Sequence, residues 1–261
     1  MLFTDQLGSV VQIEHYPKRI ISLVPSQTEL LFDLGLEDRV VGITKFCVHP
    51  DNWFRSKERI GGTKQVNYDK IQELAPDLII ANKEENTQEI VDKLSMNCPV
   101  WVSDIKDLDG ALQMIHSIGK LTDCESEAQR LISQIQAGFD SLKTTVKTDQ
   151  KRRTVHYYIW NDPDMLAGED TFIGQMIEAA GFKNGVNKKR YPVYESEMGT
   201  ADLVFLSSEP FPFKEVHIEK FQKRYPKARI IKVDGELFSW YGSRLKYVPD
   251  YFKKLHESLS E

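Results

Sequence analysis

The feature that most constrains the fold of this chain is a long amphipathic segment near its middle, residues 123–147, with the sequence DCESEAQRLISQIQAGFDSLKTTVK. Its apolar residues recur at steps of one, three and four and form a single stripe: Ala128, Leu131, Ile132, Ile135, Phe139, Leu142 and Val146. This spacing has the period of an α-helix with one buried face. About 24 residues at 1.5 Å each give a rod of roughly 36 Å, close to the width of a small domain. We interpret the segment as a rigid strut between two lobes; an ordinary long surface helix in a single domain is the alternative.

Local signals define the ends and the weak point of this helix. Thr122 or Asp123 can accept hydrogen bonds from the free N–H groups of its first turn, and Glu125 places negative charge at the positive end of the helix dipole. Gly138 is expected to weaken the helix by roughly 1 kcal/mol relative to alanine.

On either side of this segment, short β-branched runs alternate with amphipathic runs. Residues 3–13 are expected to form an edge hairpin, and a helix is expected to begin at Ser26, which forms a capping box with Glu29, and to end at Gly35. The other expected strands are residues 19–24, 40–44, 77–81, 100–102, 154–160, 201–206 and 229–234. The other expected helices are residues 68–74, 87–94, 108–121, 171–180, 213–225 and 248–259. Strands that alternate with helices predict parallel sheets covered on both faces.

The two halves of the chain repeat this plan. The run APDLII at residues 75–80 is echoed by ADLVFL at residues 201–206. The predicted fold class is α/β, with two lobes built on parallel sheets and joined by one long backbone helix. The predicted domains are an N-terminal lobe at residues 1–122, the linking helix at 123–150 and a C-terminal lobe at 151–261.

Composition excludes several classes of protein. The net charge is −5 and no basic run is clustered, so we expect no nucleic-acid partner. No apolar window of 18 residues exists, so we expect no transmembrane segment. The first 19 residues lack the pattern of a signal peptide, which predicts a cytoplasmic protein if Met1 is the native start. Cys47, Cys98 and Cys124 are odd in number, which suits a reducing compartment.

Sequence signatures of common enzymes are missing. The chain has no P-loop, no glycine-rich dinucleotide motif, no Gly-x-Ser-x-Gly and no His-Glu-x-x-His. Missing motifs do not by themselves exclude an enzyme. Together with the family resemblance described next, they lead us to expect no enzyme activity, no catalytic residues and no resident cofactor.

Six short runs together resemble a known family. They are KRIISLVPSQTELLF at 18–32, VVGIT at 40–44, IGG at 60–62, APDLII at 75–80, GEDTFI at 168–173 and AGFKN at 180–184. In this order, around a central helix, they resemble the helical-backbone (class III) substrate-binding proteins of ABC importers. The chain is similar to the vitamin B12-binding and ferric-siderophore-binding members over about residues 4–259.

This resemblance implies a function. The chain would capture a metal chelate (a ferric siderophore, haem or a corrinoid) in a cleft between its lobes and deliver it to an ABC permease. It would be periplasmic or attached to the cell surface, and monomeric. The alternative is a cytoplasmic chelate carrier, or a cofactor-handling enzyme, on the same scaffold.

Candidate ligand residues follow from the rule that open α/β sheets bind ligands at the carboxyl ends of their strands. The aromatic candidates are Phe46, Trp160, Tyr191, Phe238, Trp240 and Tyr241, and the polar candidates are Ser26, His49, Lys64 and Arg244. Some of the aromatic residues can instead fill the core beneath long loops. Trp240 is the first choice as a ligand contact, because an extended or single-turn loop can direct Phe238, Trp240 and Arg244 to one side.

The sequence departs from the vitamin B12-binding pattern at two positions. Lys64 stands where the family places an aromatic residue, and Ser239 where it places an acid. Lys64 and Arg244 suit an anionic ligand, or are simply solvated cations. Cys47 and His49 lack further ligands at suitable spacing, so we predict no metal site.

Two acidic residues match the family's permease-docking positions. Asp69 and Glu197 fall where the resemblance places one exposed carboxylate on each lobe. In the family such residues pair with arginines of the permease.

Overall fold

The computed structural model describes residues 1–146 and 152–260, which divide into two compact units. Unit 1 comprises Met1–Ile105, Asp109–Gln134 and Tyr241–Arg244, and unit 2 comprises the remaining described residues. The division falls within the long helix α6 (Glu125–Thr145), so each unit contains part of that helix.

Unit 1 is built on a five-stranded parallel sheet with the strand order β5-β4-β3-β6-β7. Its strands are β3 (Ile20–Ser22), β4 (Val40–Ile43), β5 (Glu58–Arg59), β6 (Leu78–Asn82) and β7 (Val100–Ser103). Every residue of β3, β6 and β7 is buried, because helices cover both faces of the sheet. The bounds of β3, β4, β6 and β7 confirm the strands predicted in this half to within two residues at each end.

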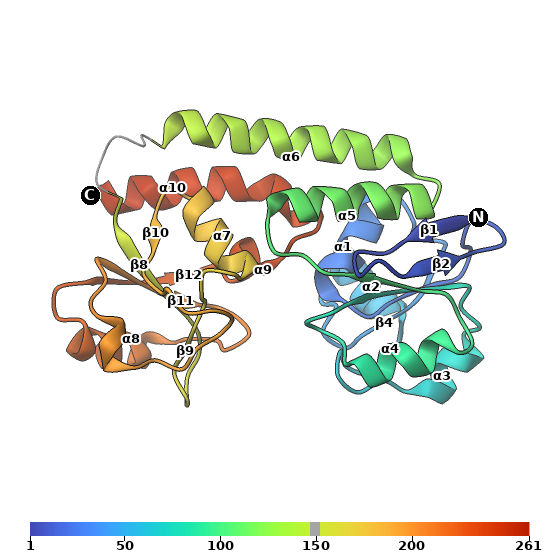
Figure 1. Cartoon of the computed structure of the whole chain (residues 1–261), viewed down its shortest axis with the longest axis horizontal. Coiled ribbons are helices and arrows are strands. Elements are labelled where there is room, and N and C mark those ends of the chain that lie inside the picture. Colours follow the sequence, from blue (N-terminus) through green and yellow to red (C-terminus); the bar gives the residue numbers. More distant parts are fainter. Residues whose placement is uncertain (147–151, 261) are drawn as a thin grey trace. The chain divides into compact units, whose positions relative to one another are not determined.

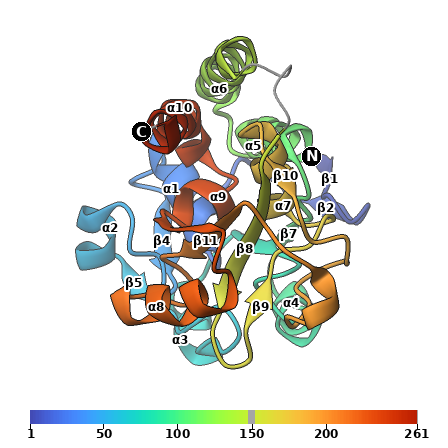
Figure 2. The same cartoon turned by 90° about the vertical axis from the view of Figure 1, so that its left-hand side faces the viewer.

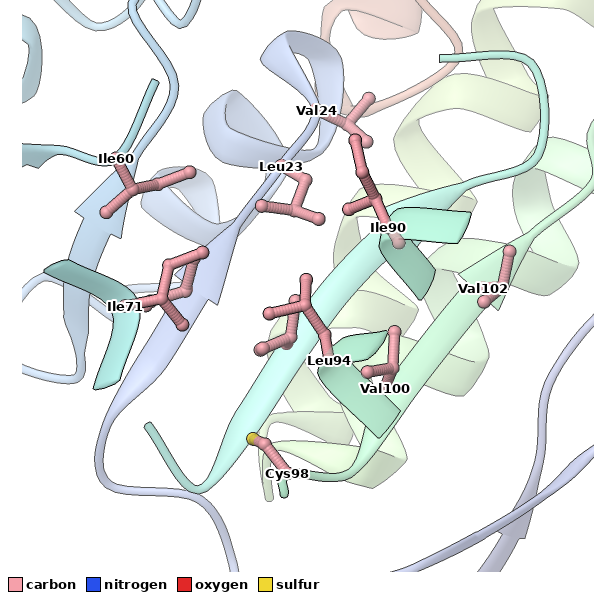
Figure 3. Close-up of a cluster of buried hydrophobic side chains, with 12 residues drawn as sticks. Leu23, Val24, Ile60, Ile71, Ile90, Leu94, Cys98, Val100 and Val102 are labelled. Carbon is pink, nitrogen blue, oxygen red and sulfur yellow. The ribbon is translucent and has the colours of Figure 1, made fainter. Parts of the chain in front are cut away.

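Helices lie on both sides of this sheet (Figure 1). They are α3 (Tyr68–Glu73) and α4 (Gln88–Ser95) on one side, and α1 (Pro25–Asp33) and α5 (Leu108–Leu121) on the other. Figure 3 shows the core beneath α3 and α4, where Ile71, Ile90 and Leu94 pack against Val100 and Val102 of β7 and the neighbouring strands. The expected hairpin is present as β1 (Leu2–Thr4) and β2 (Val10–Gln12).

Two local details of unit 1 differ from the predictions. Helix α1 begins at Pro25, and no side chain caps it, so the predicted capping box of Ser26 with Glu29 is wrong. Proline at the first helical position lacks an N–H group and has a suitable φ, which reduces the need for a cap. The helix α2 (Asp51–Ser56) was not predicted; it buries Trp53, whose ring lies 5.4 Å from that of Phe32.

Unit 2 contains a second mainly parallel sheet, with the order β10-β8-β11-β12. Figure 2 labels four strands of this sheet, β8, β9, β10 and β11. Its strands are β8 (Thr154–Trp160), β9 (Met165–Leu166), β10 (Lys183–Asn184), β11 (Leu203–Ser207) and β12 (Arg229–Val233). Strand β9 runs antiparallel to β8 and closes a short hairpin. Its helices are α7 (Phe172–Ala179), α8 (Glu215–Arg224), α9 (Glu236–Ser239) and α10 (Val248–Ser260), and it also contains the 3-10 turn η1 (Ser196–Met198).

The long central helix is confirmed, with corrected ends. The stripe from Ala128 to Leu142 is buried along the length of α6, as its period predicted. Thr122 donates its hydroxyl to Ile118 O in the preceding helix, and Asp123 has a φ of +56°, so the helix starts after both residues, at Glu125. Val146 lies just past the end of α6, and Lys147 falls outside the described residues.

Candidate ligand-binding site

The carboxyl edge of the unit 1 sheet carries a network of buried polar side chains. Asn82, at the end of β6, donates from Nδ2 to Ser103 Oγ at 2.9 Å, and Gln27 donates to the same hydroxyl. Thr28 donates to Ser22 Oγ at 2.8 Å. These five side chains are buried and form two hydrogen-bonded groups, one at the ends of β6 and β7 and one at the end of β3.

The predicted ligand residues of unit 1 differ in their exposure. Phe46 is 52% exposed, and the ammonium group of Lys45 lies 5.1 Å from the centre of its ring. His49 and Tyr241 are half-buried, Lys64 is exposed, and Ser26 is buried. Phe46 is therefore a largely exposed aromatic side chain in the loop after β4.

Arg244 forms a bidentate ion pair with Glu29, for which the sequence predicted only a capping role. Its Nε and Nη2 donate to the two carboxylate oxygens of Glu29 at 2.9 and 2.8 Å. The two side chains are only 14% and 13% exposed, so the interpretation of Arg244 as a solvated cation is wrong. Burial raises the pKa of Glu29, while the charge of Arg244 opposes this shift. A ligand anion would have to compete with Glu29 for this guanidinium group.

The segment that carries Arg244 packs closely on helix α1. A Cβ on Gly242 would lie only 2.3 Å from Ser26 O, so only glycine allows this approach. Ser26 is thus a packing partner of the segment Tyr241–Arg244 through its main chain, which explains its burial.

Glu85, in the loop after β6, is a second acid at this edge. Burial raises its pKa, and the nearby charge of Lys64 partly offsets the effect. The sequence signal that could have identified Glu85 was its position three residues after the end of β6.

Cys47 is directed into the protein. Its sulfur lies 3.1 Å from both Thr28 Oγ1 and Thr44 Oγ1, within hydrogen-bonding distance of each hydroxyl. Burial raises the pKa of the Cys47 thiol, which favours its protonated form. Within residues 1–146 and 152–260, no group of three or more His, Cys, Asp or Glu side chains is arranged to hold a metal ion.

The carboxyl edge of the unit 2 sheet presents a group of rings that we call the aromatic edge: Trp160, Phe211, Phe213 and His217. Trp160 ends β8, is 40% exposed and lies 5.7 Å from Phe211, centre to centre. Phe211 lies 4.8 Å from Phe213 and 5.3 Å from His217. His217 was not among the predicted ligand residues. The sequence signal for it is its position in the first turn of the helix that follows β11.

Two of the predicted aromatic contacts are largely internal. Phe238 is fully buried, and its ring lies 5.1 Å from Tyr157 and 4.9 Å from Phe252, so its prediction as a ligand contact is wrong. The short helix α9 turns Phe238 into the core. Trp240 is 7% exposed, and its Nε1 donates to Glu209 Oε1 at 2.8 Å. For Trp240 the geometry favours the alternative interpretation, a side chain that fills the core beneath the loop.

The remaining predicted residues lie on the surface of their own units. Tyr191 is half-buried, with the Arg190 guanidinium 5.5 Å from its ring centre. Asp69 lies in the first turn of α3 and Glu197 in η1, and both are exposed. Their docking role stays a prediction.

Two grooves of about 600 Å³ lie among other residues. One is lined by His116, Glu125, Ser126, Gln129, Arg130 and Ser133 of helices α5 and α6. The other, near the start of β8, includes Arg152, Thr154, Glu178 and Asn184. Neither groove is lined by a predicted ligand residue.

This architecture agrees with a family assignment. Residues 20–202, well over half of the chain, match the periplasmic binding protein family. The chain belongs to this family. Among its curated relatives, the uncharacterized ABC transporter substrate-binding lipoprotein YvrC of Bacillus subtilis is 30% identical over 188 residues, which are 69% of this chain and 59% of YvrC. The cobalamin-binding protein of Halobacterium salinarum is 27% identical over 183 residues, which are 69% of this chain and 49% of the relative. The chain thus spans about half to three fifths of the length of these relatives.

Solved structures share the family's fold. A possible iron-binding, periplasmic solute-binding protein of Staphylococcus epidermidis is 24% identical, with a TM-score of 0.79 over 95% of this chain and 100% of that chain. The siderophore-binding protein BauB, bound to ferric iron and acinetobactin, is 19% identical, with a TM-score of 0.80 over 97% of each chain. At these identities the likeness establishes the fold alone. No helix in the described part of the chain is long and apolar enough to cross a membrane.

Proposed function

We propose that this chain captures a metal chelate (a ferric siderophore, haem or a corrinoid) and delivers it to the permease of an ABC importer. Membership of the periplasmic binding protein family supports this proposal. So do the relatives that are described as an ABC transporter substrate-binding lipoprotein and as a cobalamin-binding protein. Family membership also favours a binding protein over an enzyme or a cytoplasmic carrier on the same scaffold.

The observation that carries the proposal is the exposure of an aromatic side chain at the carboxyl edge of each sheet. Phe46 in unit 1 and Trp160 in unit 2 are 52% and 40% exposed. Aromatic rings bury a large area and accept flat, partly apolar ligands, which is the chemistry of a metal chelate with an organic periphery. Lys64 is exposed and lies two residues after Gly62, where a Cβ would be 3.1 Å from the Phe46 ring. Its ammonium group can attract the charge of an anionic chelate.

The proposed partners and location follow from the same family. The chain would act outside the cytoplasmic membrane, in the periplasm or at the cell surface, as a monomer that docks on an ABC permease. Exposed Asp69 and Glu197 are the proposed docking residues. Because docking depends on surface charge, it should weaken as salt is raised.

The test is direct titration of the purified protein. Haem, cyanocobalamin, a ferric catecholate and a ferric hydroxamate are added separately, and binding is followed by absorbance, tryptophan fluorescence and native mass spectrometry. We expect one of these classes to form a 1:1 complex and to quench fluorescence. Trp160→Ala should weaken that complex by roughly 1–3 kcal/mol, or about 5- to 150-fold.

A matched control is His116→Ala on helix α5, outside both carboxyl edges, which should leave affinity unchanged. If the folded protein binds none of the four chelates, the proposed function is wrong.

A further inference from the structure

Within the aromatic edge, the imidazole of His217 has a defined tautomer. His217 lies in the first turn of α8, and the main-chain N–H of Lys214 donates to His217 Nδ1 at 2.8 Å. A main-chain N–H can only donate, so Nδ1 must supply its lone pair. The proton of the neutral imidazole therefore resides on Nε2.

The surroundings of His217 hold the ring in this orientation. It meets Phe211 and Phe213 edge to face, at interplanar angles of 84° and 85°. Phe211 in turn contacts Trp160, the half-exposed ring at the end of β8. His217 is itself half-buried, and the described residues provide no hydrogen-bond partner for Nε2.

Two lysines near His217, one on α8 and one on β12, already have oxygen partners. Lys220 donates to Asn161 Oδ1 and Asp164 Oδ1 at 2.7 and 2.8 Å. Lys232 pairs with Glu215 at 2.5 Å. His217 therefore presents a neutral donor, its Nε2–H, beside the exposed ring of Trp160.

We propose that His217 donates its Nε2–H to an oxygen atom of the bound chelate and does not coordinate the metal. This inference rests on the proposed function and deepens it. Coordination through Nε2 requires a lone pair there, which would move the proton to Nδ1. Two donors, Nδ1–H and the Lys214 N–H, would then face each other, and the hydrogen bond between them would be lost. The ligand class that fits is an oxygen-rich ferric chelate with aromatic or planar groups, such as a catecholate, in preference to haem held by a histidine.

The tautomer can be tested without any ligand. Long-range ¹H–¹⁵N correlation spectra of the free protein, assigned by comparison with His217→Phe, should show His217 protonated on Nε2. A proton on Nδ1 would contradict the geometry and overturn the inference.

The binding role is tested with a ferric catecholate. His217→Phe keeps a ring of similar size but removes the donor, so affinity should fall by about tenfold. His217→Asn restores both an acceptor for Lys214 N–H and an N–H donor, and it should recover part of that loss. His116→Phe on α5 makes the same substitution outside the aromatic edge and should change nothing. Circular dichroism of each variant confirms folding.

The outcomes separate the two proposals. If wild type binds the catecholate and His217→Phe binds it equally well, the inference is wrong while the proposed function stands. If haem binds with the spectrum of histidine-ligated iron and His217→Phe abolishes that spectrum, His217 is a metal ligand and the inference is also wrong. If wild type binds no chelate, both proposals fail.

Discussion

At the scale of single residues, Trp160 and Trp240 differ in what their indole rings contact. Trp160 is 40% exposed and touches Phe211 with one edge. Trp240 is 7% exposed and donates to Glu209, which also accepts from Ser239 Oγ at 2.7 Å. The ring of Trp160 is available to a ligand, whereas the ring of Trp240 is already hydrogen-bonded to Glu209 within unit 2.

We therefore expect the two alanine variants to separate stability from binding. Trp240→Ala should lower the free energy of unfolding by about 3–5 kcal/mol, because it opens a cavity and removes a donor from Glu209. Trp160→Ala should lower it by less than about 1 kcal/mol. Urea denaturation of both variants measures the difference. Equal losses of stability would contradict the exposure difference.

His156 is a buried titratable group in the same unit. It lies on β8, is fully buried and contacts the hydroxyl of Tyr225 through Nδ1 at 2.8 Å. A Cβ on Gly185 would lie 2.7 Å from its ring, so the site is tightly packed. Burial lowers the pKa of His156 from 6.5 to about 4, although the main chain of Gly185 favours the charged form.

Stability should therefore depend on pH between about 6.5 and 4. Above this range the ring is neutral in both the folded and the unfolded chain, and the contribution of neutral His156 to stability is fully present. As the pH falls, the unfolded chain binds a proton that the folded chain excludes, so stability is lost down to the folded pKa. The loss amounts to up to about 3 kcal/mol.

His156→Gln cannot titrate, so its free energy of unfolding should fall less than that of wild type over this range. Chemical denaturation at several pH values measures the two slopes. Identical slopes would show that His156 does not control this dependence.

At the scale of secondary-structure elements, α6 and α10 make a close contact within unit 2. A Cβ on Gly138 of α6 would lie 2.9 Å from Pro249 Cγ and 3.5 Å from Pro249 Cβ. Lys253 of α10 also donates to Ser141 Oγ of α6 at 3.1 Å. The glycine that weakens the isolated helix therefore allows the two helices to approach.

Gly138→Ala should consequently destabilise the protein, by about 1 kcal/mol or more, although alanine is the better helix former. Ser133→Ala, at an exposed position of the same helix, is the control and should change stability by less than about 0.5 kcal/mol. Thermal and urea unfolding report both values. A stabilised Gly138→Ala protein would mean that propensity outweighs the contact with Pro249.

At the scale of the whole molecule, each unit presents one of the acids proposed for docking. Both Asp69 in unit 1 and Glu197 in unit 2 are exposed. Each lies outside the ligand residues named for its unit. Their proposed effect is on the encounter with a permease, through complementary charge.

We expect the double variant Asp69→Lys, Glu197→Lys to bind its chelate with unchanged affinity but to support transport poorly. Asp109→Lys with Glu257→Lys reverses two other exposed acids, one in each unit, and matches the change in net charge. Uptake of a labelled chelate in reconstituted vesicles is the measurement. Equal transport by the two double variants would exclude a specific docking role for Asp69 and Glu197.

Features that depend on local pattern could be predicted from the sequence. The buried stripe of α6, the ranges of α5 and β8, and the parallel α/β class followed from periodicity and from the order of strands and helices. Six motifs in order predicted the family, and the strand-end rule led to Phe46 and Trp160, which are exposed at the carboxyl edges. Such signals are readable because neighbouring residues in the chain must share a face of one helix or one strand.

Tertiary structure alone decided which side chains face inward and with what they pair. It buried Phe238 beneath α9, joined Arg244 to Glu29 across 215 residues of sequence, and placed Pro249 against Gly138. It also brought His217 into contact with Phe211 and oriented its imidazole through Lys214. Periodicity could not reveal these contacts, because the partner of a side chain is set by how separate elements pack, and packing depends on the shapes and charges of residues far apart in the chain.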